Sequence, residues 1–319
     1  MGLASRFRDE SGIKVRLIRA DRGERLSMLR SGNPGFQLFA EDIVDLRPSV
    51  DENLVQAPIG VKLPASVYEK MVDVLRFRGE LYFLPLRPNV RLMYADKDKL
   101  SDAGAVAPTT FAEFKTVARR LKDENHGEPA VTLSLSKADG GGPAAVTISE
   151  LILGQRGDPR VLNSDASVRA FQFLRECWEE GLLRDESLFG KHDTEVGYLK
   201  DGVAALAQNW SFTSSELLKS SQLDRFEVRP GWQGPHANVI GGDALGIPRG
   251  VTGKEKKAAI RLAEYLMSEK AQRFLAKEIS WPSIQPKINE DLGRDSESFR
   301  AMAAALEEGW YRPTDRYWA

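Results

Sequence analysis

The sequence contains little of the chemistry that marks a disulfide-stabilised, metal-binding or membrane-spanning protein. Cys177 is its only cysteine, so the chain cannot form an internal disulfide and has no CxxC motif. The three histidines, His126, His192 and His236, stand far apart, and none has the spacing of a zinc site. No apolar run reaches the roughly 18 residues of a membrane span. We therefore expect no metal, no cofactor and no membrane-spanning segment.

Neither sign of charge is in excess. The 45 Lys and Arg residues and 46 Asp and Glu residues give a formal net charge of −1. A nucleic-acid-binding protein usually shows a basic excess or a basic stripe, so we expect no nucleic-acid partner. Hydrophobic residues make up 42% and charged residues 29%, which is typical of a soluble globular protein. The 319 residues suffice for two domains with large cores.

Motifs of catalysis are weak or absent. The sequence has no GxSxG elbow. Residues 250–254, GVTGK, resemble a phosphate loop only faintly, because the GxxxxGK[ST] spacing is incomplete. Asp243, which follows Gly241 and Gly242, is not part of a GxGxxG fingerprint. We interpret residues 250–254 as a loop at a helix start, and the motifs give no support for an enzyme.

Hydrophobic patterning predicts alternating strands and helices, and hence an α/β fold. Residues 13–18 alternate apolar and polar side chains, as a strand does. Further strands are predicted at residues 36–40, 79–85, 90–95, 131–135, 202–207 and 241–248, and helices at about 108–121, 164–178 and 254–268. Within the second helix, Val168, Phe171, Leu174 and Trp178 recur at three- and four-residue spacing, which predicts that they face the core.

Aromatic and polar side chains gather at the ends of predicted strands, where ligands bind in open α/β sheets. Trp210 lies between an apolar strand and a helix start. A flat apolar ring beside free helix amides suits a sugar, although a core role is equally open. Trp232 and Trp281 lie in Pro- and Gly-rich loops, where a core role is harder to assume. Tyr82, Arg87 and Asn89 occupy a similar position around a strand end.

Four stretches of the chain follow a family pattern in the same order. They are FRDESGIKV at 7–15, GELYFLPLRPNVRLMYADKDKL at 79–100, LKDGVAALAQNW at 199–210, and GGDALGIPRG with the helix after it at 241–277. The first is similar to "FEKETGIKV" and the second to "GKLYGLPYDTNTEVLYYNKDLF". The chain thus resembles the family 1 extracellular solute-binding proteins of ABC importers, the maltose-binding-protein-like group.

The resemblance implies a periplasmic-binding-protein (type 2) fold with two α/β lobes and a ligand cleft between them. It implies a first lobe of residues 1–90 and 244–281 and a second of residues 91–243 and 282–319. The implied partners are a small solute, most simply a mono- or oligosaccharide, and the membrane subunits of an ABC permease. We expect a monomer in the periplasm or anchored outside the membrane. A sensory binding protein, a protein for an acidic solute, and a lyase or hydrolase of similar shape stay open as alternatives.

The resemblance also implies particular ligand contacts. It matches Trp210 to a stacking tryptophan and places the other contacts on a cleft segment, on a ligand-facing turn and in the loop after residues 36–40. These residues are Arg87 and Asn89, Gly242 and Asp243, and Glu41 and Asp42. Arg87 and Arg91 stand where acidic or neutral residues are more usual, which favours an acidic sugar. Arg87 is the better candidate to pair with such a ligand, since a guanidinium matches carboxylate geometry.

The sequence departs from the family pattern at both ends. The pattern begins with one more strand, central in its sheet, whereas this sequence opens midway through the helix that follows. It also ends before a final helix that many members have. The first residues lack the apolar core of a signal peptide, so such a peptide either never existed or has been removed. We therefore expect a truncated or divergent member that lacks the first strand and whose first lobe is the less stable one.

Overall fold

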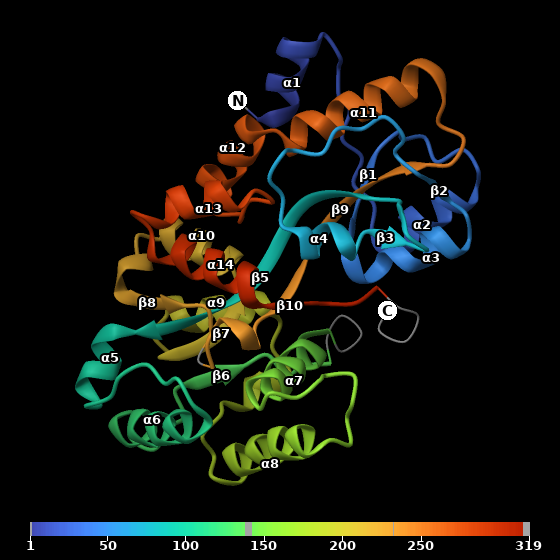
Figure 1. Ribbon diagram of the computed structural model, residues 1–319. Helices are drawn as coiled ribbons and strands as arrows, with labels where there is room; N and C mark the ends of the chain where they lie inside the picture. Colours follow the sequence, from blue (N-terminus) through green and yellow to red (C-terminus); the bar gives the residue numbers. More distant parts are fainter. Residues whose placement is uncertain (1, 138–141, 232, 315–319) are drawn as a thin grey trace. The chain divides into compact units, whose positions relative to one another are not determined.

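The computed structural model describes residues 2–137, 142–231 and 233–314, and these residues form two compact units. Unit 1 contains the described residues up to Asn89, Gly241–Ile288, and those from Tyr311 on. Unit 2 contains the described residues of Val90–Ile240 and Asn289–Trp310. Each unit combines helices with a sheet (Figure 1), as the alternating hydrophobic pattern predicted.

The division differs from the predicted lobes at Val90, which belongs to unit 2, and at three segments that belong to unit 1. These segments are residues 241–243, residues 282–288 and the described residues from Tyr311 on. The first segment joins unit 1 because Asp42 and Asp243 are paired across two antiparallel strands. The second joins it because the backbone N–H of Tyr68 donates to the carbonyl of Ile284 at 3.2 Å.

In unit 1, two strands pair with a long strand whose first two residues belong to unit 2. β1 (Phe39–Asp42) and β2 (Val55–Gln56) are both antiparallel to β9 (Val239–Pro248). The remaining strands of this unit are β3 (Arg76–Phe77), β4 (Glu80–Leu81) and the first part of β5 (Leu84–Asp96), while β10 (Trp310–Tyr311) pairs with β9. Phe39 and Phe83 pack edge to face at 6.3 Å in the core of this unit.

Helices surround the strands of unit 1. They are α1 (Leu3–Ser11), α2 (Arg22–Arg30), α3 (Leu46–Asp51), α4 (Glu69–Asp73), α11 (Gly253–Met267) and α12 (Glu269–Ile279), and α13 (Pro286–Gly293) begins here. α1 ends at Gly12, which lies in the left-handed region at φ 72°. α2 begins with a capping box, in which Asp21 and Glu24 each accept from the other's backbone N–H.

The prediction of a strand at residues 13–18 was wrong. The segment has no regular secondary structure, and Leu17 and Ile18 are 83% and 42% exposed. Alternating apolar and polar residues give an extended segment one apolar and one polar face, but the segment belongs to a sheet only if it is hydrogen-bonded to a neighbouring strand. No strand in the described part of the chain pairs with this segment.

In unit 2, β5 is the centre of the sheet. β7 (Leu206–Trp210) and β8 (Phe226–Arg229) pair antiparallel with it, and β6 (Val131–Leu133) pairs parallel with β7. The helices of this unit are α5 (Lys97–Asp102), α6 (Phe111–Glu124), α7 (Gly142–Gly154), α8 (Asp165–Glu179), α9 (His192–Lys200), α10 (Phe212–Lys219) and α14 (Glu297–Glu308). Short 3₁₀ turns are also present among the described residues: η1 (Ile43–Asp45) in unit 1, and η3 (Asp185–Leu188), η4 (Leu223–Arg225) and η5 (Pro235–Ala237) in unit 2.

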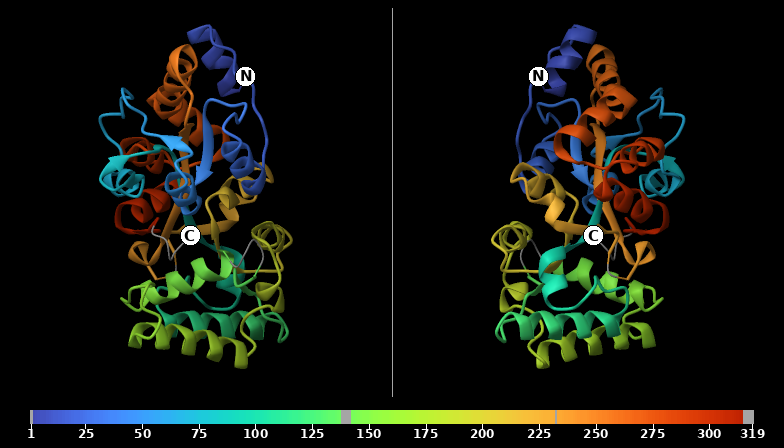
Figure 2. Two further views of the ribbon diagram at one scale, coloured as in Figure 1. Left: turned by 90° about the vertical axis from the view of Figure 1, so that its right-hand side faces the viewer. Right: turned by 90° about the vertical axis from the view of Figure 1, so that its left-hand side faces the viewer.

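α6 and α8 lie side by side in the views of Figures 1 and 2, and aromatic rings join them. Phe173 of α8 meets Phe111 and Phe114 of α6 edge to face, at 4.4 and 5.4 Å between ring centroids. Such pairs add about 0.5–1.5 kcal/mol to the burial of their surface. Cys177 packs in the same core, where burial raises the pKa of its thiol to about 12.

Of the four residues predicted to face the core on α8, Leu174 packs against it, but the other three lie on an exposed face. Val168, Phe171 and Trp178 are 47%, 43% and 43% exposed. The buried face carries smaller residues beside one ring: Ala166, Ala170, Phe173 and Cys177. Both sets recur with the period of a helix, and alanines let a helix approach its neighbours closely, so large side chains alone did not identify the core face.

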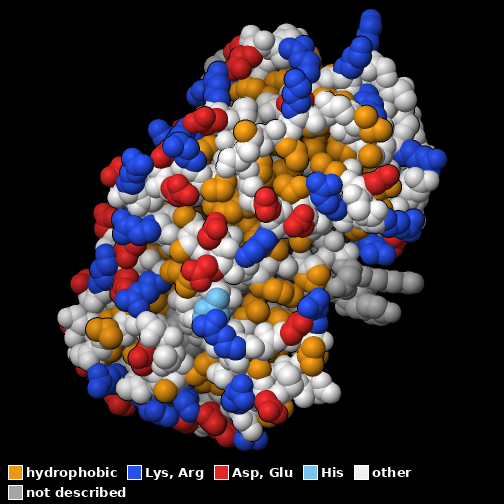
Figure 3. Space-filling view, in the orientation of Figure 1, with side chains coloured by type: hydrophobic (Ala, Val, Ile, Leu, Met, Phe, Trp, Pro, Cys, Tyr) orange, Lys and Arg blue, Asp and Glu red, His pale blue; other side chains and the backbone are white. Residues whose placement is uncertain are grey.

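The surface carries mixed charge. Figure 3 shows Lys and Arg side chains interspersed with Asp and Glu, with no wide field of a single sign on the face drawn. Within the described residues, no helix has the length and apolar character needed to cross a bilayer. Those residues also contain no group of three or more His, Cys, Asp or Glu side chains placed to hold a metal ion.

Candidate functional site

Four of the sequence-predicted site residues come together in unit 1. We call Arg87, Asp243, Trp281, Asp42 and Arg312 the Arg87 cluster. Arg87 on β5 donates from Nε to Oδ2 of Asp243 on β9. The guanidinium carbon of Arg87 lies 4.2 Å from the ring centroid of Trp281, a cation–π contact. The cluster thus joins an aromatic ring to charged hydrogen-bonding groups.

A second ion pair completes the Arg87 cluster. Arg312 Nη2 lies 3.1 Å from Asp42 Oδ1, and Asp42 keeps 44% of its side chain exposed. The cluster therefore carries two cations and two anions. Burial raises the pKa of Asp243 above its ordinary value, while the positive charge of Arg87 opposes the shift. The exposed carboxylate oxygens of the Arg87 cluster can accept hydrogen bonds, and the guanidinium groups of the cluster can donate them.

Gly242 brings the two strands of the cluster close together. Its φ is +144°, a conformation that side-chain-bearing residues rarely adopt. A Cβ at this position would overlap the carbonyl oxygen of Arg87 and lie 2.9 Å from Cα of Pro88. The glycine thus allows the backbone approach that sets Asp243 beside Arg87. The family resemblance placed Gly242 and Asp243 in a ligand-facing turn, but both lie inside β9.

Glu41 and Asp42 were predicted in a loop, but they are the last two residues of β1. Because successive side chains of a strand point to opposite faces, the two carboxylates separate. Glu41 is buried and forms a two-point ion pair with Arg25, in which Nε donates to Oε2 at 2.7 Å. Burial raises the pKa of Glu41, and Arg25 opposes the rise. Glu41 is thus engaged in a buried pair, whereas Asp42 reaches the Arg87 cluster.

Two further predicted residues lie on or near β5. Tyr82 packs against the aromatic core of unit 1, with its ring 6.2 Å from that of Phe77. Asn89 lies two positions after Arg87 on β5 and therefore on the same face of the strand.

The remaining predicted residues belong to unit 2. Trp210 ends β7 immediately before α10, as the sequence predicted. It is 9% exposed and belongs to a small hydrophobic cluster with Val146 and Val239, against which Trp310 packs. Trp232 lies outside the described residues.

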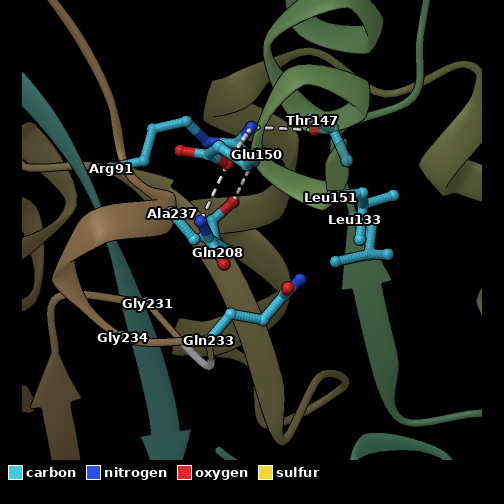
Figure 4. Close-up of a pocket in the computed structure, with 10 residues that line it drawn as sticks. All are labelled: Arg91, Leu133, Thr147, Glu150, Leu151, Gln208, Gly231, Gln233, Gly234 and Ala237. Carbon is cyan, nitrogen blue, oxygen red and sulfur yellow. Dashed lines mark hydrogen bonds and ion pairs between the residues drawn. The ribbon is translucent and has the colours of Figure 1, made fainter. Parts of the chain in front are cut away.

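Sequence reasoning missed a polar network in the interior of unit 2. We call Arg91, Glu150, Glu195, Gln208 and Thr147 the Arg91 network. Figure 4 shows the Arg91 side chain meeting Glu150 and Thr147 of α7 and Gln208 of β7. A signal existed, since Arg91 and Glu150 are single charges inside the apolar runs VRLMYA and ISELIL. Arg91 was considered only as a ligand contact, but its side chain is fully buried.

A small cavity lies beside the Arg91 network. Its lining includes Arg91, Thr147, Glu150, Gln208 and Gln233, and its volume is about 10 Å³. That volume is about what a single water molecule needs. The cavity cannot hold a sugar ring.

Comparison with known proteins agrees with this architecture. Residues 2–299 match the family of bacterial extracellular solute-binding proteins. No curated protein sequence matches. Solved structures that resemble the chain include the GacH receptor of Streptomyces glaucescens, solved unliganded and with acarbose, at 18% identity and a TM-score of 0.81 over 98% of this chain and 83% of that one.

Two further structures show the same fold. Maltose-bound MalE3 of T. maritima has 18% identity and a TM-score of 0.81, over 98% of this chain and 85% of that one. UgpB of Mycobacterium tuberculosis, in complex with glycerophosphocholine, has 17% identity and a TM-score of 0.80, over 97% and 82%. The predicted two-lobed α/β fold is confirmed. Because the family match spans nearly the whole chain, the protein belongs to the bacterial extracellular solute-binding proteins.

Proposed function

We propose that this protein captures a neutral mono- or oligosaccharide for an ABC importer and holds it by hinge closure. It acts as a binding protein and not as an enzyme. A ligand that binds the closed form more tightly shifts the population toward it, and the closed form is then delivered to the permease. Of the ten predicted contact residues, we assign ligand binding in unit 1 to Arg87, Asp243, Trp281 and Asp42.

The composition of the Arg87 cluster is the observation that carries the proposal. A sugar has apolar ring faces and hydroxyl edges, and its recognition needs an aromatic surface beside hydrogen-bond donors and acceptors. Trp281 offers the aromatic ring, the guanidinium of Arg87 offers donors, and the carboxylates of Asp243 and Asp42 offer acceptors.

Charge balance favours a neutral ligand over an acidic one. Arg87 pairs with Asp243, Arg312 with Asp42, and the fully buried Arg91 with Glu150. An acidic solute at Arg87 would have to compete with Asp243 or lie beside it, and like charges at close range repel. We therefore replace the acidic sugar that Arg87 and Arg91 suggested in the sequence with a neutral sugar.

Calorimetric titration with a panel of solutes tests the proposal. The panel contains the ligands of similar proteins, namely maltose, acarbose, tagatose and glycerophosphocholine, together with glucuronic acid. We expect at least one neutral saccharide to bind and glucuronic acid not to bind. Trp281→Ala should weaken that binding about 30-fold, which corresponds to the roughly 2 kcal/mol of a buried aromatic anchor.

Trp178→Ala is the matched control, because Trp178 is an exposed tryptophan on α8 in unit 2. Its affinity should equal that of the unmodified protein. A panel in which only glycerophosphocholine or glucuronic acid binds would replace the sugar with an anionic or zwitterionic solute. A sensory role differs from import in the partner, not in the site, and pull-down with purified permease subunits separates the two.

A further inference from the structure

The interior of unit 2 holds one guanidinium between two carboxyl groups. Arg91 Nη1 lies 3.1 Å from Glu150 Oε2 and donates to Thr147 Oγ1 at 2.8 Å. Nη2 donates to the carbonyl oxygen of Gln208 at 2.5 Å. Glu195 on α9 is joined to the network through Ser134, whose hydroxyl donates to Glu195 and whose carbonyl oxygen accepts from Thr147 Oγ1 at 2.6 Å. All of these side chains lie in the interior, where an unbalanced charge is costly.

The two carboxyl groups are held in different ways. Glu150 Oε2 accepts from the side-chain amide of Gln208 at 2.8 Å, and Oε1 accepts from the backbone N–H of Val239 at 3.3 Å. Glu195 Oε1 accepts from the hydroxyl of Ser134 at 2.7 Å, but Oε2 has no hydrogen-bond partner among the described residues. If both glutamates were ionised, the network would carry one negative charge more than Arg91 neutralises.

Two ways to balance that extra charge differ in the space they need. A bound cation needs a cavity and several ligands, but the cavity here has room for about one water molecule. The described residues also offer no cluster of three metal-binding side chains. A proton needs no cavity.

We propose that the Arg91 network is a proton-binding site, in which Glu150 and Glu195 together hold one proton against the single positive charge of Arg91. With the proton bound, the network is neutral overall. The geometry of one buried guanidinium and two buried carboxyl groups carries the proposal. In agreement, burial raises the pKa of Glu150 and of Glu195 to about 7, and Arg91 opposes both shifts.

Other charged groups near the network lie on the elements that pack against α7 and α9. They are His236 on η5 with Arg156 and Glu308 beside it, Arg169 on α8, Arg184 over the ring of Tyr198, and the pair Lys200–Glu216. Burial and the charge of Arg156 lower the pKa of His236, so protonation of His236 destabilises the folded state.

The proton of the network acts with the opposite sign. Because burial raises the pKa of the glutamates, the folded state binds more protons than the unfolded state between about pH 4.5 and pH 7. The contribution to stability is complete below the unfolded pKa and is lost as the pH rises through the folded pKa. One such proton makes the unfolding equilibrium constant rise about tenfold per pH unit in this window.

Urea unfolding of the full chain from pH 5 to pH 8.5 tests the proposal. Glu150→Gln and Glu195→Gln each replace one carboxyl group with a neutral side chain of the same shape, which mimics the protonated form. We expect each variant to match the unmodified protein at pH 5 and to be 10- to 100-fold less unfolded at pH 8. The comparison cancels the contribution of His236, which is present in every variant.

Two further variants sharpen the test. Glu179→Gln removes an exposed glutamate of α8 and should follow the unmodified protein at every pH. The double variant Glu150→Gln/Glu195→Gln leaves Arg91 without an anion and should be less stable than either single variant throughout. The proposal is overturned if both single variants keep the pH profile of the unmodified protein. It is also overturned if both fail to fold at pH 5, where a neutral side chain is expected to fit, or if the double variant is as stable as the singles.

Discussion

The close approach of β9 to β5 at Gly242 leads to a sharp stability prediction for unit 1. Gly242→Ala introduces a Cβ that overlaps the Arg87 carbonyl and lies 2.9 Å from Pro88 Cα, on a backbone with φ +144°. The strained backbone conformation costs about 1–3 kcal/mol. The steric overlap with rigid backbone atoms adds about another 1–3 kcal/mol, as overpacking does elsewhere. We therefore expect the variant to lose about 2–6 kcal/mol of unfolding free energy.

Gly250→Ala separates the two contributions. Gly250 also belongs to unit 1 and has φ +93°, but no atom lies within 4 Å of its Cβ position. This control should lose only the conformational part, about 1–3 kcal/mol. Denaturant unfolding of both variants gives the comparison, and solute affinity should fall in Gly242→Ala alone because Arg87 and Asp243 are displaced. Equal losses of stability in the two variants would refute the inference that backbone proximity requires the glycine.

Four further outcomes are expected. Phe173→Ala should lower the free energy of unfolding in urea by about 3–5 kcal/mol, because the Phe173 ring fills the core between α6 and α8. Phe171→Ala removes a half-exposed ring and should change it by about 0.5 kcal/mol or less. Similar losses in the two variants would contradict the assigned faces of α8. Arg87→Gln should weaken the binding of the neutral saccharide in calorimetry, and a binding of glucuronic acid to the unmodified protein that this variant abolishes would restore charge recognition. Trp210→Ala should weaken binding about 30-fold if its ring contacts ligand, and unchanged affinity in a folded variant would leave it a core residue. Hydrogen exchange should be fast at residues 14–19 and slow in β5 and β7, and slow exchange at residues 14–19 would show a paired strand there.

Sequence patterns identified elements best where local signals and burial agree. The apolar runs that became β6 and the second half of β5 are buried on both faces, and their hydrophobicity alone marks them. The strand predicted at residues 202–207 was misplaced, because β7 begins only at Leu206 and includes the polar residues Gln208 and Asn209. A capping side chain also marks the start of a helix, as Thr110 does before α6 and Ser164 before α8. Each of these signals lies within a few residues of the element that it marks.

The errors arose where a distant partner decides the structure. Residues 13–18 have the alternation of a strand but no neighbouring strand to pair with in the described chain. In α8 two faces have helical spacing, and contact with α6 selects the one with small residues. Neither choice can be made from the segment itself.

The candidate site shows the same limit. Arg87, Asp243 and Trp281 were each identified from strand ends, loops and the family pattern. That Asp243 would neutralise Arg87 depends on the pairing of segments about 156 residues apart. Arg91 and Arg87 look alike in sequence and lie four residues apart, on the same face of β5. Arg91 is nevertheless fully buried, because α7 packs on it in unit 2, whereas Arg87 is partly exposed in unit 1.

X-ray scattering during a titration tests the central claim, solute capture by hinge closure, most directly. The saccharide that binds in calorimetry is added to the purified protein up to saturation, and the radius of gyration is followed. We expect the radius of gyration to fall in proportion to the bound fraction, and Trp281→Ala to shift the midpoint to higher saccharide concentration. A radius that stays constant while calorimetry shows saturation would contradict hinge closure.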